Sequence, residues 1–497
     1  MSAALSDRRT RRGSARACAA RACAALFVLL CLLKPAAAEA GGFTITVMGG
    51  RRSSSLVNLA RPDDPTAVFH NPAGLADLEG VQLHASNAFY FVDTDFRLKA
   101  LDPQRYPEVN PAGCGTGQND PCPWPVDGDG FYDRVIEPES YFGTIPYLGV
   151  TTNLGFLGAP GVGVGFSVYL PAFYGATMPD DAPTRYHMMA GHFAVGSATF
   201  GVGWRLTRWL SVGANVSYNY MQIRLKRKFS VIAALTPVGQ QPSGEALLGQ
   251  QGIGDITIDY TGVDHGAGGG VGVLITPLPW LAIGLNYLIA TDPRFDGDVS
   301  VTSRDTKTME DIFKLLQYKI PKRLRVEMAY PQAVGFGISV APTPRVEIGV
   351  DVRLWLYQLY EEQKVTPVYD PDEPGKEPFT EEALSSDKRY NMSWEVAGGV
   401  LVRPFSRVPG LELMAGFSYD RSPIPDETFA MDNPNLNSLN FATGVRWAIN
   451  ERWRVCVSYM MFVYLERDID NSETEPPSNG QGTGTAFLPA LEAQYRF

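Results

Sequence analysis

Five alternate positions near residue 225 combine apolar side chains with one guanidinium group. Alternate residues share one face of a β-strand. The residues on this face are Met221, Ile223, Leu225, Arg227 and Phe229. A guanidinium can bind a carboxylate through two parallel hydrogen bonds, and the apolar neighbours would suit an acyl chain. The series therefore predicts a path for a hydrophobic molecule with a carboxylate head. The alternative interpretation is the base of a loop that packs only against its neighbours.

Two groups of acidic and histidine residues have the residue types of metal sites without the spacing. Asp127, Asp129 and Asp133 stand at calcium-loop spacing, but the closing Glu of such a loop is missing. An Asp/Gly turn is the simpler interpretation, and calcium binding stays open. His187 and His192 lack the helical spacing that brings ligands to one face. We expect no metal centre and no cofactor.

The same histidines do not form the pattern of a catalytic site. A hydrolase in a membrane wall needs a serine nucleophile, a histidine and an orienting partner within hydrogen-bond reach. None of His187, His192 and His265 lies in an alternating strand beside a suitable serine. His70 and His84 fall in or next to a short N-terminal motif. We therefore expect a protein that is not an enzyme.

This N-terminal motif carries two helix-start signals seven residues apart. Asp64 precedes Pro65, and Asn71 precedes Pro72. In each pair a side-chain acceptor stands before a residue whose fixed φ suits the first helical position. We expect two short helical turns, the second closed near Gly74. A peptide of this size does not fold alone, so other elements must surround it.

Alternation of apolar and polar residues predicts what those elements are. In residues 211–220 the polar face carries only Gly, Ser and Asn. The apolar face carries Val212, Ala214, Val216, Tyr218 and Tyr220. Residues 346–354, 411–420 and 453–461 alternate in the same way. A soluble sheet would favour Lys and Glu on its polar face. Small polar residues inside and aliphatic or aromatic residues outside are typical of a β-barrel in lipid.

The connections between the predicted strands differ in length on the two sides. Short turns fall at residues 206–209, 276–280, 341–344 and 449–453. The long polar or Pro-rich segments lie at about residues 101–140, 175–190, 229–262, 292–330, 362–388, 421–438 and 466–484. Short turns on one side and long loops on the other are the arrangement of bacterial outer-membrane barrels. With strands of about ten residues, we expect roughly twelve to sixteen strands.

Parity assigns further side chains to the two faces of this barrel. Met414, Met460 and Phe462 point inward and extend the predicted path for a hydrophobic ligand. On the outside, the strand that bears Arg227 continues with a polar and mostly basic row. This row comprises Gln222, Arg224, Lys226 and Lys228. Such a row suits anionic lipopolysaccharide, a predicted partner together with outer-membrane lipid.

Both ends of the chain carry export and insertion signals. Residues 1–40 combine a basic start, an apolar stretch at 24–33 and small-x-small cleavage patterns, so we expect a cleaved signal peptide. A membrane anchor is disfavoured, because this stretch has only about ten residues. The final strand ends in Phe497. This ending resembles the sorting signal that the outer-membrane assembly machinery reads, which makes that machinery a predicted partner.

The composition excludes several other classes of protein. Of the 497 residues, 19% are charged and 11% aromatic, and the net charge at pH 7 is -10. This acidic balance, without a basic stripe, argues against nucleic-acid binding. Beyond the signal, no apolar stretch approaches the roughly 18–20 residues of a spanning helix. Cys114 and Cys122 flank a polar loop, and we predict a disulfide between them in an oxidising compartment.

Several motifs resemble the FadL/TodX (OmpP1) family of outer-membrane transporters of long-chain fatty acids and other hydrophobic compounds. They are Gly42-Phe43, Asp63-Asp64, the triad Asn71, Pro72 and Ala73 with Gly74, and a segment from Tyr419 to Glu427. The resemblance implies about 14 antiparallel strands around a small, partly helical hatch in the lumen. It assigns residues 1–40 to the signal peptide, 41–82 to the hatch and 83–497 to the barrel. The hatch residues are Phe43, Asp63, Asp64, Asn71, Pro72, Ala73 and Gly74.

The resemblance also implies a mechanism. Hydrophobic ligand would be captured outside, enter an apolar pocket, shift the hatch and leave through a lateral opening, by diffusion alone. We expect a monomer in the outer membrane. Two alternatives remain: a general diffusion porin for small polar solutes, whose lumen would be lined by Glu347, Asp351, Arg353 and Arg454, and a surface receptor or adhesin built on the long loops.

Overall fold

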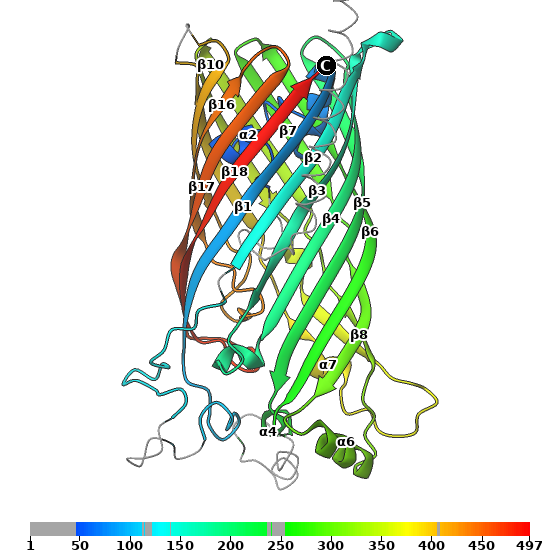
Figure 1. The fold of residues 1–497 in the computed structure, drawn as a ribbon, viewed down its shortest axis with the longest axis vertical. Helices are drawn as coiled ribbons and strands as arrows, with labels where there is room; N and C mark the ends of the chain where they lie inside the picture. The colour runs from blue at the N-terminus through cyan, green and yellow to red at the C-terminus, as the bar shows by residue number, and fades with distance from the viewer. Residues whose placement is uncertain are drawn as a thin grey trace, which may run out of the picture. The chain divides into compact units, whose positions relative to one another are not determined.

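The fold is a β-sheet that closes on itself (Figure 1). The computed structural model describes residues 46–111, 114, 122–139, 141–235, 240, 254–404 and 408–497. Within these residues the sheet has eighteen strands, of which fourteen form the closed ring. The ring strands are β1 (Val81–Leu98), β2 (Tyr141–Leu154), β3 (Ala159–Thr177), β4 (Ala190–Arg205), β5 (Leu210–Phe229), β6 (Ile256–Leu278), β7 (Leu281–Ile289), β10 (Ala333–Thr343), β11 (Val346–Trp355), β14 (Ser393–Val402), β15 (Leu411–Asp420), β16 (Ser438–Ala448), β17 (Trp453–Ile469) and β18 (Gly480–Arg496).

Every pair of neighbours in the ring is antiparallel, and the last strand closes on the first. β1 pairs with β18 from Gln82↔Arg496 to Leu98↔Gly480. Closure leaves no edge strand, which is the condition for a sheet to stand in lipid. The prediction of an all-β antiparallel barrel of about 14 strands is therefore confirmed.

The predicted inside and outside faces are also found. In β5, Val216, Tyr218 and Tyr220 are exposed, whereas Met221 and Ile223 are buried. Trp209, just before β5, is exposed too. From Trp209 to Tyr220 a strand covers about 37 Å, or about 28 Å along the membrane normal at a tilt of about 40°. This span fits the apolar band of about 25 Å in outer-membrane barrels, with aromatic residues at both borders.

The turns lie where the alternation predicts them, but the long connections hold more structure than expected. Short turns lie at the end of the barrel that carries the C-terminus, and the long connections lie at the other end (Figure 1). Four strands extend the sheet within segments that the sequence analysis treats as loops. They are β8 (Arg294–Thr302), β9 (Arg323–Glu327), β12 (Glu362–Val368) and β13 (Ser386–Asp387). The outer part of β6 pairs with β8 instead of β7.

The long connections also contain short helices. These are η3 (Pro183–Tyr186), α4 (Val231–Leu235), α6 (Thr306–Leu315), η4 (Tyr357–Leu359) and α7 (Glu381–Leu384), while η2 (Gly155–Leu157) forms the β2–β3 turn. Asp305 caps α6 by accepting a hydrogen bond from the Thr308 N–H. None of the helices in the described part of the chain is long and apolar enough to cross a membrane.

Residues 46–78 lie inside the ring and form three short helices. They are α2 (Gly50–Ser55), α3 (Ala67–His70) and η1 (Pro72–Asp77). The predicted turns correspond to α3 and η1, but α2 has no capping signal and was not expected. The expectation that the second turn closes near Gly74 is wrong, since η1 continues to Asp77. Gly74 is required for space, because a Cβ there would stand 2.3 Å from Pro62 Cγ.

Candidate transport path

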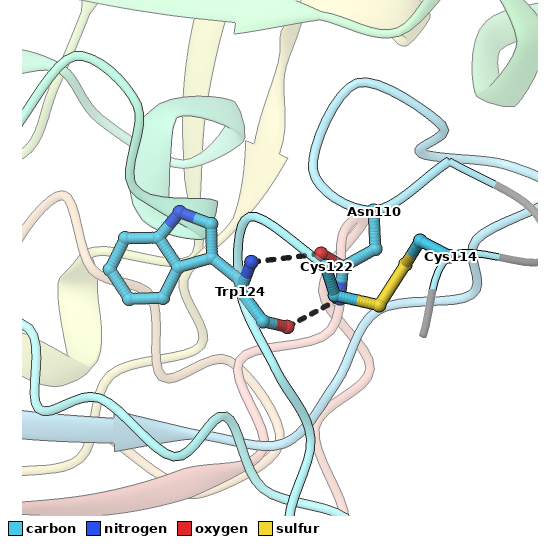
Figure 2. The surroundings of a disulfide bond; sticks show 4 residues. All are labelled: Asn110, Cys114, Cys122 and Trp124. Carbon is cyan, nitrogen blue, oxygen red and sulfur yellow. Dashed lines mark hydrogen bonds between the residues drawn. A yellow bond between two sulfur atoms is a disulfide. The ribbon is translucent and has the colours of Figure 1, made fainter. Parts of the chain in front are cut away.

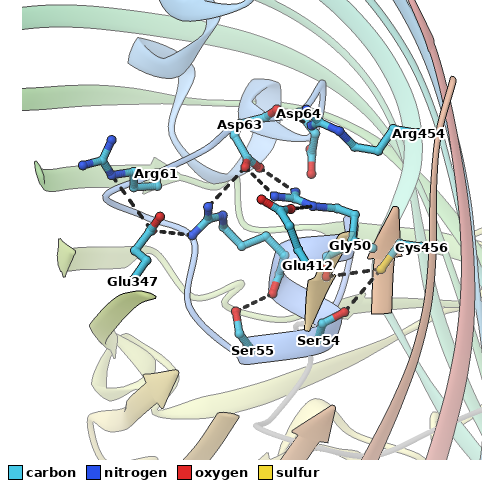
Figure 3. Close-up of polar contacts among 12 residues, drawn as sticks. Gly50, Ser54, Ser55, Arg61, Asp63, Asp64, Glu347, Glu412, Arg454 and Cys456 are labelled. Carbon is cyan, nitrogen blue, oxygen red and sulfur yellow. Dashed lines mark hydrogen bonds and ion pairs between the residues drawn. The ribbon is translucent and has the colours of Figure 1, made fainter. Parts of the chain in front are cut away.

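The Asp63 carboxylate joins the N-terminal segment to the barrel wall (Figure 3). It accepts hydrogen bonds from Arg446 Nη1 and Nη2 of β16 at 2.9 and 2.7 Å. Arg51 of α2 approaches the same carboxylate at 3.2 Å and pairs with Glu347 of β11 at 2.6 Å. The two guanidinium groups hold the pKa of Asp63 well below its usual range, despite burial. Side chains of the barrel wall thus neutralise the charges of Arg51 and Asp63 in this segment.

A second ion-pair network fixes the following residues. Arg52 reaches the Glu395 carboxylate of β14 at 2.7 Å. Arg353 of β11 lies 3.3 Å from the same carboxylate and donates to Asn58 Oδ1 at 2.8 Å. Asp351 accepts hydrogen bonds from two backbone N–H groups of the segment, at 2.7 and 3.0 Å. Breaking one partner of such a buried network leaves an uncompensated charge, which costs about 3–5 kcal/mol.

The other predicted hatch residues organise the segment locally. Asp64 Oδ1 accepts the Thr66 N–H at 2.8 Å, and Asn71 Oδ1 accepts the Ala73 N–H at 3.2 Å. The Asn71 amide also donates to Leu59 O and to Val273 O of β6. Pro72 is the first residue of η1, as its fixed φ favours. Phe43 lies outside the described residues.

A belt of inward-facing glycines receives the backbone of this segment. Ten successive ring strands, from β3 round to β16, each contribute at least one glycine whose Cβ would stand within 3 Å of the segment. In strand order, one from each strand, these are Gly163, Gly203, Gly213, Gly272, Gly284, Gly337, Gly349, Gly399, Gly416 and Gly444, and β3 and β10 add Gly165 and Gly335. At Gly163 the added atom would stand 1.9 Å from Leu75 O. The wall is therefore shaped to the segment over most of its circumference.

An apolar cavity of about 60 Å³ lies among the extracellular connections. Three residues of the predicted path line it: Leu225, Arg227 and Phe229. Most of its other lining is aliphatic or aromatic and comes from β4 and the residues just before it, and from β6, β9, β12 and α7. These residues are Met188, Ala190, Ile258, Tyr260, Leu324, Val326, Val365 and Leu384.

The cavity has one polar end. The Arg227 guanidinium stacks 4.2 Å from the Phe229 ring centroid and lies 3.5 Å from Leu384 O. Asp432 also lines the cavity and pairs with Lys388 at 2.8 Å. Burial lowers the pKa of His187 to about 4, so this imidazole is neutral at pH 7. Its Nε2 has no hydrogen-bond partner among the described residues.

Aromatic rings connect this cavity with a second one beside the N-terminal segment. Tyr260 donates to Phe295 O, and the Phe295 ring lies 6.1 Å from that of Phe193. Phe193 lies 6.2 Å from Tyr330, which lines the second cavity, also of about 60 Å³. Tyr169 of β3 and Phe69 of α3 line the same cavity, with ring centroids 5.2 Å apart.

The barrel wall is interrupted where this second cavity meets β3. The outermost pair between β2 and β3 is Tyr147↔Tyr169. Beyond it, residues 141–146 pair with β1 and residues 172–177 pair with β4. Pro171 lines the cavity at this point, and a proline cannot donate to a sheet ladder. Among the described residues, only at the outer end does a backbone hydrogen bond join the two sides again, from the Glu139 N–H to Thr177 O at 2.8 Å. The cavity thus lies beside a stretch of wall without strand-to-strand hydrogen bonds.

The closed barrel agrees with a comparison of the sequence with known protein families. The model of a family described as outer membrane protein transport protein (OMPP1/FadL/TodX) matches residues 35–497. The chain belongs to this family. Its barrel fold and its family indicate a protein of the bacterial outer membrane. No curated protein sequence matches the chain.

Solved structures of OMPP1/FadL/TodX proteins share this fold. A FadL homologue from Pseudomonas aeruginosa is 14% identical, with 92% of this chain and 100% of that chain covered and a TM-score of 0.74. The toluene transporter TbuX of Ralstonia pickettii is 17% identical, with 92% and 99% covered and a TM-score of 0.59. The toluene transporter TodX of P. putida is 15% identical, with 87% and 94% covered and the same TM-score.

The remaining predicted path residues of this OMPP1/FadL/TodX chain lie elsewhere in the barrel. Met221, Ile223, Met460 and Phe462 are buried in the main apolar cluster but line neither cavity. Met414 packs in a separate cluster with Leu401 and Cys456. Cys456 in turn contacts α2, with its Sγ 3.4 Å from Ser54 Oγ (Figure 3). Met414 is thus on the side of the N-terminal segment, away from the extracellular cavity.

The sequence analysis did not identify several residues that line the second cavity or lie between the two cavities. Phe193 and Val195 alternate within β4, so parity alone could have identified them as inward-facing. Tyr169 and Phe295 also lie in alternating segments. Phe69 had no such signal, because its position depends on how the N-terminal segment meets the wall.

Two loop features complete the extracellular side. Cys114 and Cys122 form a disulfide (Figure 2). Beside it, Asn110 and Trp124 exchange side-chain and backbone hydrogen bonds of 2.5 and 3.0 Å. Asp127 uses its carboxylate to accept the Asp129 and Phe131 N–H groups and to pair with Arg97. This is the geometry of an Asp/Gly turn, and no acidic or histidine cluster suited to a metal is present among the described residues.

Proposed function

We propose that this protein takes up hydrophobic compounds, long-chain fatty acids among them, by ligand-gated passive diffusion through a plugged barrel. The observation that carries the proposal is the sequence of apolar spaces. The extracellular cavity, the aromatic rings around Phe193 and the second cavity lead from the outside to the unpaired part of β2 and β3. Apolar walls with few polar groups suit a hydrophobic ligand.

The polar end of the first cavity supports a carboxylate-bearing ligand. In the described residues, Arg227 pairs with no carboxylate within 4 Å, while Asp432 is already held by Lys388. The Arg227 guanidinium could therefore donate two parallel hydrogen bonds to the ligand carboxylate. The aromatic rings farther along would also accommodate an aromatic hydrocarbon. The lining of this path thus suits both fatty acids and toluene-like hydrocarbons, and uptake assays separate the two cargoes.

Residues 46–78 are suited to the role of gate. They contact strands on several sides of the ring, and Phe69 lines the second cavity. A ligand in that cavity would press on α3, and the released cargo would leave sideways through the unpaired part of β2 and β3. Residues 41–82 would then be the hatch, and residues 1–40 the removed signal peptide.

The arrangement gives less support to a general porin. Glu347, Asp351 and Arg353 would have to line open water, yet each is buried against the N-terminal segment. The loops offer no specific observation in favour of a receptor or adhesin.

The plug proposal is tested by deleting residues 42–75 and recording single-channel conductance in planar bilayers. We expect a large increase in conductance, because removal of the segment opens the lumen. Unchanged conductance would show that the segment does not occlude the barrel.

Growth of a deletion strain on oleate and on toluene, with and without the restored gene, then identifies the class of cargo.

A further inference from the structure

A polar cavity of about 430 Å³ lies among the extracellular connections and shares no lining residue with the apolar cavity. All seven of its lining residues are polar or charged, whereas most of the residues that line the apolar cavity are aliphatic or aromatic. They are Glu108, Arg185, Lys228, Asp255, Thr257, Ser303 and Arg304. A hydrophobic cargo would gain nothing here, so this cavity is not part of the proposed path for such a cargo.

The position of Lys228 places this cavity toward the outside of the barrel. Lys228 continues the outward series of β5 that includes the exposed Tyr218 and Tyr220. It stands eight residues beyond Tyr220, which corresponds to about 27 Å along the strand and about 20 Å above the membrane border. At this level an outer-membrane protein is surrounded by the phosphorylated saccharide of lipopolysaccharide.

Positive charge exceeds negative charge in the cavity. Arg304 pairs with Glu108 at 2.7 Å, and Lys228 Nζ approaches the same carboxylate only to 4.0 Å. Arg185 donates to the backbone oxygen of Glu108 at 2.6 Å and has no carboxylate partner among the described residues. Burial raises the pKa of Asp255 to about 7. Three cationic side chains, Arg185, Lys228 and Arg304, therefore face two carboxyl groups in this cavity.

Several polar atoms of residues that line the same cavity also have no hydrogen-bond partner among the described residues. Arg185 and Asp255 are more than nine-tenths buried. Arg185 Nε, Asp255 Oδ1 and Ser303 Oγ lack hydrogen-bond partners within the described part of the chain. Buried polar groups are normally satisfied by protein, solvent or ligand. The guanidinium N–H, the serine hydroxyl and the Lys228 ammonium are donors, which an anion with several oxygens would satisfy together.

We propose that this cavity binds a phosphate group of the lipopolysaccharide saccharide. The charge excess favours an anion, and the convergent donors favour an oxyanion with several acceptor oxygens. The outward position of Lys228 favours an anion fixed to the surrounding leaflet over free phosphate. The proposal concerns attachment to the membrane surface and goes beyond transport of a hydrophobic cargo.

The test measures binding of the purified full-length barrel in detergent to three probes. The probes are short-chain lipopolysaccharide, the same lipopolysaccharide after chemical dephosphorylation, and inorganic phosphate. The test variant combines Lys228→Ala with Arg304→Ala. The matched control is Arg294→Ala, which removes an exposed arginine of β8 that lies outside the cavity and pairs with Glu327. Heat-modifiable migration in gels establishes that each barrel is folded.

We expect the double variant to bind phosphorylated lipopolysaccharide at least about tenfold more weakly than the unaltered protein, since two cations that make charge-assisted hydrogen bonds to the phosphate are lost. The Arg294→Ala control should bind as before, and dephosphorylation should weaken binding to the unaltered protein by a similar factor. Equal affinity for both lipopolysaccharide forms would overturn the proposal. Binding of inorganic phosphate as tight as that of lipopolysaccharide would overturn the assignment to the glycolipid.

Discussion

At the scale of single residues, Arg227 separates the two classes of cargo. Arg227→Gln keeps a polar, hydrogen-bonding side chain, although a shorter one, and removes the charge that would bind a carboxylate. We expect uptake of labelled oleate to fall about tenfold or more, because a charge-assisted bidentate pair is lost. Uptake of toluene should change little. Arg224→Gln is the matched control, because Arg224 lies on the outer face and pairs with Asp259 at 3.0 Å. Equal loss for both cargoes would assign Arg227 a structural role.

Asp255 provides a pH-dependent test of the loop structure. Burial, opposed by the Tyr186 hydrogen bond and by Arg185 and reinforced by Glu108, raises the pKa of Asp255 from 3.8 to about 7. The folded state therefore binds more protons than the unfolded state between about pH 4 and 7, and this contribution to stability is lost as pH rises through that window. Asp255→Asn should flatten the decline of thermal stability from pH 5 to 7.5 by about 2–6 °C. An identical slope in both proteins would contradict the assignment.

At the scale of elements, neighbouring glycines of β14 test the fit between α2 and the wall. A Cβ at Gly399 would stand 2.2 Å from Ser55 O, whereas a Cβ at Gly398 meets no atom within 4 Å. We expect Gly399→Ala to destabilise the barrel by about 1–3 kcal/mol, as overpacking does. Gly398→Ala should behave like the unaltered protein in thermal unfolding in detergent. Equal stability of the two variants would mean that α2 can shift at no cost.

Elements also show what the sequence could and could not predict. The alternation in residues 211–220 is local, so parity identified the faces of β5 and the inward position of Met221. The strands β8 and β9 were missed although Phe295, Leu324 and Val326 alternate within them. Those strands are short and lie in polar segments, where the pattern is too brief to stand out. Their pairing with β6 and β12 is set by the rest of the sheet.

The candidate path was only partly predictable for a different physical reason. Parity places Leu225, Arg227 and Met414 on the inside equally, but it says nothing of height within the barrel or of the residues opposite. Met414 consequently belongs to the cluster beside Cys456, while Leu225 and Arg227 line the extracellular cavity. Which inward residues meet is fixed by strand register and by the course of residues 46–78. Both are properties of long-range contacts.

At the scale of the whole molecule, the proposed transport would require the N-terminal segment to yield locally while the ring stays closed. The ion pairs of Asp63 and Glu395 and the glycine belt oppose removal of the entire segment. The two halves of the segment differ in their neighbours. Phe69 of α3 lines the second cavity. Ser54 and Ser55 of α2 instead pack against three glycines of the barrel wall that come late in the sequence, Gly399, Gly416 and Gly444. Movement should therefore begin at α3.

Cys456 allows this order of movement to be tested without removing any residue. Ser54 Oγ lies 3.4 Å from Cys456 Sγ, so Ser54→Cys places two thiols within reach of a disulfide after small side-chain adjustments. Oxidation would tether α2 to β17. If the ligand displaces only α3, the oxidised variant should retain at least about half of its uptake rate. If the ligand must displace the entire segment, oxidation should abolish uptake and a reductant should restore it. Ser54→Cys in a Cys456→Ala background, which cannot form the bond, is the control that separates the tether from the substitution itself.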